Sequence, residues 1–126
     1  MITVGRCLDK VRVRVPLDVA DLSTDARVGE DYEADPLVDT RTTLGLLSEM
    51  LEAMQTVADQ LAQWNHDTIV IHGLDDNIVP SSASEPIGDL PGVIRLTYPD
   101  GRHELFNEPF GPDVVAELIA WAKQRL

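Results

Sequence analysis

Cysteine and long apolar runs are almost absent from this sequence. A single Cys7 among 126 residues cannot form an internal disulfide, which excludes a small secreted domain stapled by disulfides. No apolar run approaches the roughly 18 residues that suggest a membrane-spanning helix, and the start MITVGRCLDKVRVRV lacks an apolar signal core. We therefore expect no transmembrane segment and a cytoplasmic protein.

Positive charge is also scarce. Ten Lys and Arg against 22 Asp and Glu give a formal net charge of −12. Nucleic acids and anionic membrane surfaces are bound by clustered cations, so neither is an expected partner. The rest of the composition, with 44% hydrophobic and 25% charged residues, is that of an ordinary folded protein of one domain. Residues 1–42 are acidic and irregular, whereas residues 43–126 are strongly patterned.

The irregular part contains two local signals. Valine alternates with arginine over residues 11–15, which indicates an extended segment, but Pro16 favours a solvated linker over a strand. Ser23-Thr24-Asp25 are residues that cap helices, and they predict a short helix over residues 25–34. Asp35-Pro36 should end it, because the residue before proline avoids the helical region.

The patterned part begins with a predicted amphipathic helix over residues 43–65, capped by Thr42 or Thr43. Short β-branched runs at 68–71 and 93–98 predict strands. We interpret the apolar stripe of the helix as a core face packed on a sheet; it consists of Leu47, Leu51, Met54, Ala58 and Leu61.

Three further signals complete the pattern. Residues 81–90 predict a short helical turn interrupted by Pro86, Pro99-Asp100-Gly101 predicts a turn, and residues 113–126 predict a closing helix. The order helix, strand, short helix, strand, helix implies an α/β fold with a parallel strand pair.

An acid and a histidine follow the two strands in the loops where functional groups gather in parallel sheets. Asp75 and Asp76 follow the first strand, and His103 follows the second. Neighbouring strand ends bring their loops together, so a carboxylate could orient the imidazole and stabilise its protonated form.

These residues stand in a larger pattern. His72-Gly73-Leu74-Asp75-Asp76, Val79-Pro80, Tyr98-Pro99 and Gly101-Arg102-His103-Glu104 occur in this order, followed by Phe106-Asn107-Glu108 and a helix containing Trp121. The pattern resembles the C-terminal part of α/β hydrolases of the monoacylglycerol lipase, lysophospholipase and serine aminopeptidase-like (S33) group. Asp35-Pro36-Leu37-Val38 resembles the segment that leads from the cap of those enzymes back to the core.

The resemblance implies a role for each of these polar residues. Asp76 matches the acid of a Ser-Asp-His triad and His103 matches its base. The resemblance therefore implies a distance of about 2.6–3.2 Å between an Asp76 carboxylate oxygen and a ring nitrogen of His103. Asp75 is then a solvated neighbour, although a shift of one residue between Asp75 and Asp76 stays open. His72 is expected to pack or cap the strand end, and His66 is interpreted as a structural residue at a helix C-terminus.

The nucleophile of that family lies in a G-x-S-x-G elbow, and this sequence contains no such pattern. The backbone donors of the oxyanion hole also belong to the family's N-terminal half. We interpret Cys7 as an incidental thiol, because nothing near it in sequence would lower its pKa. The serines lack flanking glycines at the required spacing: Ser23, Ser48, Ser81, Ser82 and Ser84.

We therefore predict an α/β fold that is a partial α/β-hydrolase core. Residues 43–126 would supply the last two parallel strands and their flanking helices, and residues 1–42 would be cap-derived segments. No metal or organic cofactor is implied, because the histidines lack a closely spaced ligand set.

The functional hypothesis is the C-terminal portion of a serine ester hydrolase that is inactive alone. Completed by an N-terminal half, it would act on an ester or acylglycerol. A truncated reading frame and a split enzyme both fit this hypothesis. The alternative is a noncatalytic interaction domain derived from a hydrolase. In either case the open sheet edge invites self-association or a complementing chain.

Overall fold

The computed structural model describes residues 9–125, which fall into two compact units. The first unit contains the described residues up to Leu17 together with Pro36–Trp64, and the second contains Asp18–Asp35 and the described residues from Asn65 onward. Cys7 lies outside the described residues. Neither unit begins or ends at residue 42, and the assignment of residues 1–42 to a cap stays a prediction.

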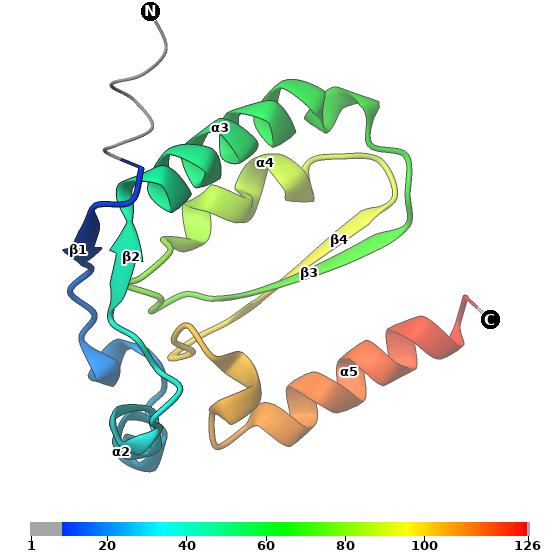
Figure 1. Ribbon diagram of the computed structural model, residues 1–126. Coiled ribbons are helices and arrows are strands. Elements are labelled where there is room, and N and C mark those ends of the chain that lie inside the picture. Colours follow the sequence, from blue (N-terminus) through cyan, green and yellow to red (C-terminus); the bar gives the residue numbers. More distant parts are fainter. Residues whose placement is uncertain (1–8, 126) are drawn as a thin grey trace, which may run out of the picture. The chain divides into compact units, whose positions relative to one another are not determined.

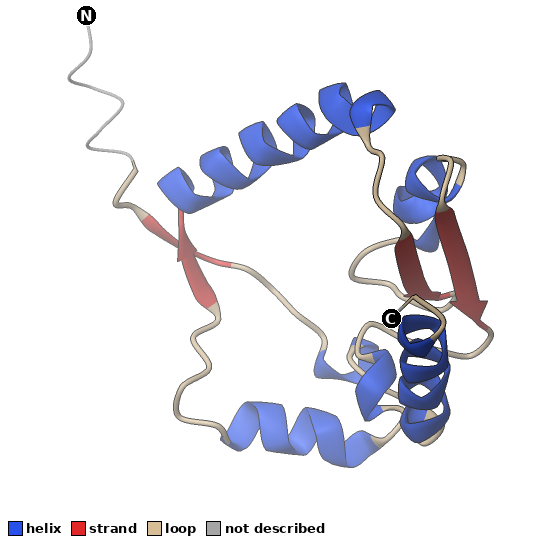
Figure 2. Ribbon diagram, turned by 90° about the vertical axis from the view of Figure 1, so that its right-hand side faces the viewer, coloured by secondary structure: helices blue, strands red, loops and turns tan. Residues whose placement is uncertain are grey.

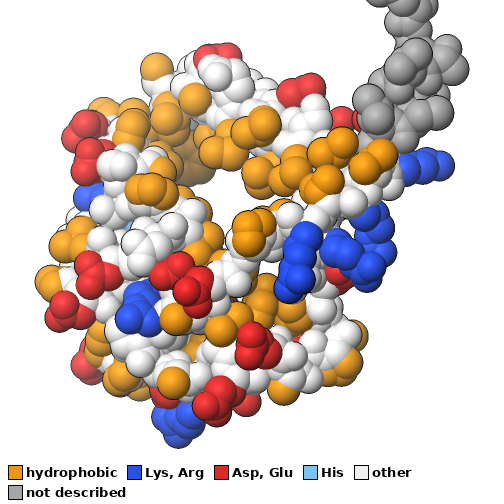
Figure 3. Space-filling view, turned by 90° about the vertical axis from the view of Figure 1, so that its left-hand side faces the viewer, with side chains coloured by type: hydrophobic (Ala, Val, Ile, Leu, Met, Phe, Trp, Pro, Cys, Tyr) orange, Lys and Arg blue, Asp and Glu red, His pale blue; other side chains and the backbone are white. Residues whose placement is uncertain are grey.

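The first unit is built on a two-stranded antiparallel ribbon. β1 (Arg12–Arg14) pairs with β2 (Arg41–Thr43), which corrects our preference for a linker at residues 11–15. Pro16 does not prevent this pairing, because it lies beyond the paired residues and no ladder bond needs its missing N–H. Lys and Arg side chains gather over this ribbon (Figure 3).

Helix α3 (Leu44–Gln60) follows the ribbon, and a turn of 3₁₀ helix (Leu61–Gln63) extends it. The Thr43 hydroxyl caps α3 by accepting from the Leu46 N–H at 3.1 Å, as one of the two predicted caps. The predicted core face is wrong: no residue of α3 is buried. The two short strands of this unit's described residues offer too little apolar surface to cover the face of a helix.

The second unit contains the predicted parallel pair. β3 (Thr68–Gly73) pairs with β4 (Val93–Tyr98) in parallel, with Thr68 opposite Val93 and Gly73 opposite Tyr98. Helices α4 (Glu85–Gly88) and α5 (Gly111–Lys123) lie on opposite sides of the pair in both ribbon views (Figures 1 and 2).

The strand pair is less buried than its continuous apolar character suggested. Apart from Gly73, the residues of both strands are half-buried or exposed, and Ile94 is 41% exposed. The reason is that the described residues supply only two strands to this sheet, so each strand has a long edge without a strand neighbour. Burial on both faces requires a wider, covered sheet.

The remaining helices agree closely with the sequence pattern. α2 (Ala26–Ala34) is capped by Asp25, whose carboxylate accepts from the Arg27 N–H at 3.0 Å, and it ends at the extended residue Asp35. Ser81–Ser84 and Leu105–Asn107 form 3₁₀ turns. α5 begins two residues earlier than predicted, because proline fits the first turn of a helix.

The core lies in the second unit, where Leu22, Leu105 and Val114 are the buried hydrophobic residues among those described. Asp100 has a φ of 60° in the predicted turn after β4, a left-handed conformation that aspartate tolerates well. Over residues 9–125, no helix combines the length and the apolar character needed to cross a bilayer.

Candidate active site

The carboxyl ends of β3 and β4 meet backbone to backbone. The Asp75 N–H donates to the Gly101 carbonyl at 2.9 Å, and the Leu74 N–H donates to the Tyr98 carbonyl at 3.0 Å. A Cβ built on Gly73 would lie 2.2 Å from the Gly101 oxygen, so only glycine permits this approach. The two loops that carry the predicted acid and base are thereby fixed side by side.

Asp76 and His103 are in contact. The distance between Asp76 Oδ2 and His103 Nδ1 is 2.9 Å, within the range expected from the sequence. Asp76 is buried with 8% of its surface exposed, whereas Asp75 is exposed. The open choice between the two aspartates is thus decided geometrically in favour of Asp76 as the partner of the histidine.

The second carboxylate oxygen of Asp76 is held by its own loop. Oδ1 accepts from the N–H groups of Ile78 at 2.9 Å and Val79 at 2.8 Å. Burial by itself raises the pKa of Asp76, but the hydrogen bonds from Val79, His103 and Ile78 outweigh it and the pKa lies below its ordinary value. The acid is therefore held in its charged form, which favours a proton on Nδ1 of His103.

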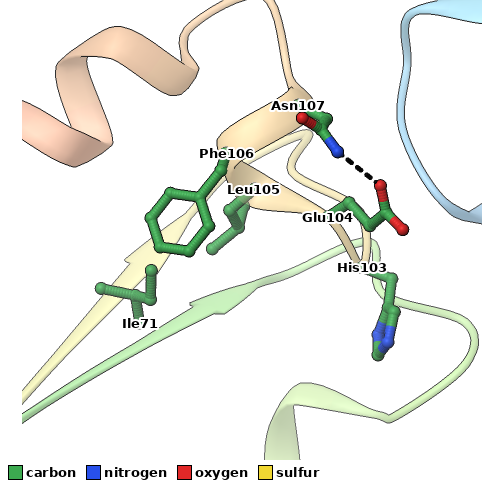
Figure 4. Close-up of a pocket in the computed structure, with 6 residues that line it drawn as sticks. All are labelled: Ile71, His103, Glu104, Leu105, Phe106 and Asn107. Carbon is green, nitrogen blue, oxygen red and sulfur yellow. Dashed lines mark hydrogen bonds between the residues drawn. The ribbon is translucent and has the colours of Figure 1, made fainter. Parts of the chain in front are cut away.

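His103 is accessible on its other side. Its side chain is 38% exposed, and among the described residues nothing hydrogen-bonds its Nε2. An open pocket of about 420 Å³ adjoins it, lined by residues 103–107 and Ile71. Figure 4 shows Phe106 facing Ile71, while the imidazole of His103 points away from both. Because the side chain is partly exposed and Nδ1 faces Asp76, Nε2 can act as a base toward a group that approaches from outside the unit.

His72 lies at the end of β3 as expected and is held on both ring nitrogens. Nε2 lies 2.9 Å from the Val79 carbonyl oxygen and 3.4 Å from Asp76 Oδ2, and Nδ1 lies 2.9 Å from Ser84 Oγ. Two acceptors face Nε2, so this nitrogen carries a proton. His66 lies in the loop between Gln63 and β3, which corrects its predicted place at a helix C-terminus.

Sequence reasoning missed the residues behind this histidine loop. Glu108 is 3% exposed and accepts from the Arg102 N–H at 2.8 Å and from the Thr24 N–H at 3.0 Å. Burial by itself raises the pKa of Glu108, but hydrogen bonds from Thr24, Arg102 and Ser23 outweigh it, so the pKa lies below its ordinary value. The signal in the sequence was the Asn107-Glu108 pair, which forms part of the family pattern but to which we assigned no role.

With this geometry in place, a comparison with known proteins identifies the family. Residues 1–110 match the family model described as serine aminopeptidase, S33. The chain belongs to this family of α/β hydrolases. Among its relatives, a monoacylglycerol lipase of Mycolicibacterium smegmatis is 27% identical over an alignment 133 residues long. The alignment covers 100% of this chain and 48% of the lipase.

A second relative matches a smaller share of this chain. An uncharacterized abhydrolase domain-containing protein of Dictyostelium discoideum is 27% identical over 114 residues, covering 87% of this chain and 12% of that protein. The S33 chain thus spans about half the length of the bacterial lipase and a small part of the Dictyostelium protein.

Solved structures of monoacylglycerol lipases share the fold. The Paleococcus ferrophilus enzyme has a TM-score of 0.78 at 20% identity, with 94% of this chain and 48% of that chain covered. A soluble variant of the Saccharomyces cerevisiae enzyme, in complex with a substrate analog, has a TM-score of 0.81 at 18% identity, covering 98% and 47%. The predicted partial α/β-hydrolase core is thereby confirmed.

Proposed function

We propose that this S33 chain supplies the acid and the base of a serine hydrolase acting on carboxylic esters such as monoacylglycerols. Asp76 is the acid and His103 is the base. The nucleophilic serine comes from polypeptide outside these 126 residues, and the chain alone is inactive. The observation that carries the proposal is the 2.9 Å contact between the buried Asp76 and Nδ1 of His103, whose side chain is 38% exposed.

The proton path follows from this contact. Asp76 keeps the proton of His103 on Nδ1, which leaves the lone pair of Nε2 to remove the proton of the attacking serine hydroxyl. The imidazolium that forms is paired with the charged Asp76, and it then protonates the departing alcohol. In the second half of the reaction, Nε2 removes a proton from water, the resulting hydroxide attacks the acyl-enzyme, and the serine regains its proton.

The test compares the chain alone with a mixture. The chain is assayed on an unactivated monoacylglycerol, with and without a separately expressed N-terminal half of a related lipase that carries G-x-S-x-G. We expect no turnover by the chain alone above a His103→Ala variant, because nucleophile and oxyanion hole are both missing. Robust turnover by the chain alone, lost in His103→Ala, would contradict this.

Aspartate variants test the assignment of the acid in any active mixture. Asp76→Asn should lower kcat by about 10³–10⁴-fold, because the amide holds the wrong imidazole tautomer. Asp75→Asn is the matched control: it removes the neighbouring carboxylate, which is exposed, and should leave kcat within about twofold. Equal losses in both variants would argue against Asp76 as the triad acid.

A noncatalytic interaction domain is the second candidate function. It is favoured by the apolar face of α3, where Leu51 and Met54 are 61% and 60% exposed. The open edges of the β3–β4 pair would also bind a second copy or a complementing chain. Stable self-association, together with no activity in the mixture, would place this function ahead of the hydrolase.

A further inference from the structure

The strongest feature that the proposed mechanism does not use is the buried carboxylate of Glu108. We propose that Glu108 is a positioning residue that fixes the loop carrying His103 and so maintains the contact between His103 and Asp76. The inference rests on the proposed function only for its consequence in catalysis. Whether Glu108 maintains the contact between His103 and Asp76 can be tested in this chain without measuring turnover.

Both oxygens of Glu108 are occupied by donors from two distant segments. Oε1 accepts from the Arg102 N–H at 2.8 Å. Oε2 accepts from the Thr24 N–H at 3.0 Å and from the Thr24 hydroxyl, and at 3.2 Å it shares the Ser23 hydroxyl with the Asn107 carbonyl, which lies 3.0 Å from the same hydroxyl oxygen. The carboxylate thus joins the backbone next to His103 to Ser23 and Thr24, which precede Glu108 by 85 and 84 residues, inside the second unit.

The same two segments are joined further by backbone groups. The N–H groups of His103 and Glu104 donate to the carbonyls of Asp21 and Leu22 at 3.3 and 2.8 Å. The Arg102 guanidinium donates to the Ser23 carbonyl at 3.0 Å and to the Ala20 carbonyl. Three consecutive residues of the histidine loop, 102–104, therefore donate hydrogen bonds to the carbonyls of residues 20–23. Glu108 adds a further connection between the same two segments through its carboxylate.

The chemistry of the site requires a carboxylate and not an amide. Four donors converge on Glu108, and a carboxylate offers only acceptors. A glutamine at this position would turn its NH₂ group toward at least one of these donors, leaving buried polar groups unpaired. The histidine loop would then lose part of its support, and the imidazole would no longer be held against Asp76.

The tautomer of the His103 ring shows directly whether the imidazole is held against Asp76. At about pH 8, above the ordinary pKa of imidazole, long-range ¹H–¹⁵N NMR spectra distinguish the Nδ1–H and Nε2–H forms. Asp76 favours the Nδ1–H form in the native chain, and Asp76→Asn is the positive control that removes this preference. In Glu108→Gln we expect the ratio of the Nδ1–H to the Nε2–H form to fall about tenfold, as for one lost charge-assisted hydrogen bond.

Glu104→Gln is the matched control. It removes the same charge from the residue beside His103. Among the described residues, the Glu104 carboxylate accepts only from the Asn107 side-chain amide, at 2.6 Å. Its tautomer ratio should stay near that of the native chain. If Glu108→Gln folds and shifts the ratio no more than Glu104→Gln does, Glu108 is not a positioning residue and the proposal is overturned.

A second variant covers the case in which Glu108→Gln does not fold. Thr24→Ala removes one donor hydroxyl and leaves the carboxylate in place, and it should shift the tautomer ratio in the same direction by a smaller factor. An unchanged ratio in folded Thr24→Ala, with Glu108→Gln unfolded, overturns the proposal. Failure of the hydrolase proposal is recognised separately, as absence of turnover in the native mixture whatever the tautomer ratio.

Discussion

The two units of this S33 chain contain similar secondary structure but differ in burial. Each has a two-stranded sheet and a long helix, α3 in the first and α5 in the second. All buried side chains among the described residues belong to the second unit, including the polar Ser23, Asp76, Ser84 and Glu108. Packing, and not helix or strand formation, therefore distinguishes the unit that carries the site from the unit that does not.

The largest loss of packing in the second unit is expected from separating the carboxyl ends of β3 and β4. Gly73→Ala should lower the free energy of unfolding by about 3 kcal/mol, because its Cβ would lie 2.2 Å from the Gly101 oxygen. Chemical denaturation measures the loss. Gly29→Ala is the control, since its Cβ would meet a Val19 side-chain carbon at 3.1 Å and alanine favours the helix. Equal stability of both variants would contradict the contact at the strand ends.

A matched pair of valines compares the helices of the two units. Val114 in α5 is 0% exposed and Val57 in α3 is 58% exposed. Val114→Ala should cost about 2 kcal/mol of unfolding free energy, from lost burial and the cavity left behind. Val57→Ala should change it by less than about 0.5 kcal/mol. A comparable loss at Val57 would mean that the α3 face is covered in solution.

Acid should weaken the second unit more than the first. The folded-state pKa values of Asp76 and Glu108 lie below the ordinary values of 3.8 and 4.5, so their stabilisation is present above those values. It is lost as the pH falls through the lowered values. Chemical denaturation at several values between about pH 6 and pH 3 should show a falling free energy of unfolding as the pH is lowered. The fall should be shallower in Glu108→Gln. A pH-independent midpoint would contradict the assignment.

The smallest effect is expected in the first unit, at the ion pairs of the ribbon. A hydrogen bond from Arg41, then the charge of Arg12, lowers the pKa of Asp39 to about 2, yet all three side chains are largely exposed. Asp39→Asn should therefore leave the unfolding midpoint unchanged within error, at low and at high salt. A clear salt-dependent loss would show that these pairs stabilise the ribbon.

The sequence predicted those features that depend on local chemistry. The caps Asp25 and Thr43, the parallel strands and the proximity of an aspartate, Asp75 or Asp76, to His103 follow from residue patterns and from the rule that parallel strand ends share one edge. The triad roles of Asp76 and His103 came only with the family resemblance, and they stay predictions.

The features it missed depend on contacts between distant segments. An apolar stripe indicates that a face can be buried, but the presence of a covering partner is not a local property, and α3 is exposed for this reason. The pairing of residues 11–15 required Arg41–Thr43, and the role of Glu108 required Ser23 and Thr24, at separations that no local pattern records.

The 84-residue separation between Thr24 and Glu108 has a consequence for the order of events during protein synthesis. Residues 18–35 leave the ribosome before the groups that pair with them, which are made only after residues 36–64 and both strands of the β3–β4 pair. Helix α3 depends on short-range contacts, and the ribbon pairs residues 27 to 31 positions apart, so both can form while the chain is still being made. The histidine loop is completed last, by closure of a long loop whose entropic cost grows only slowly with its length.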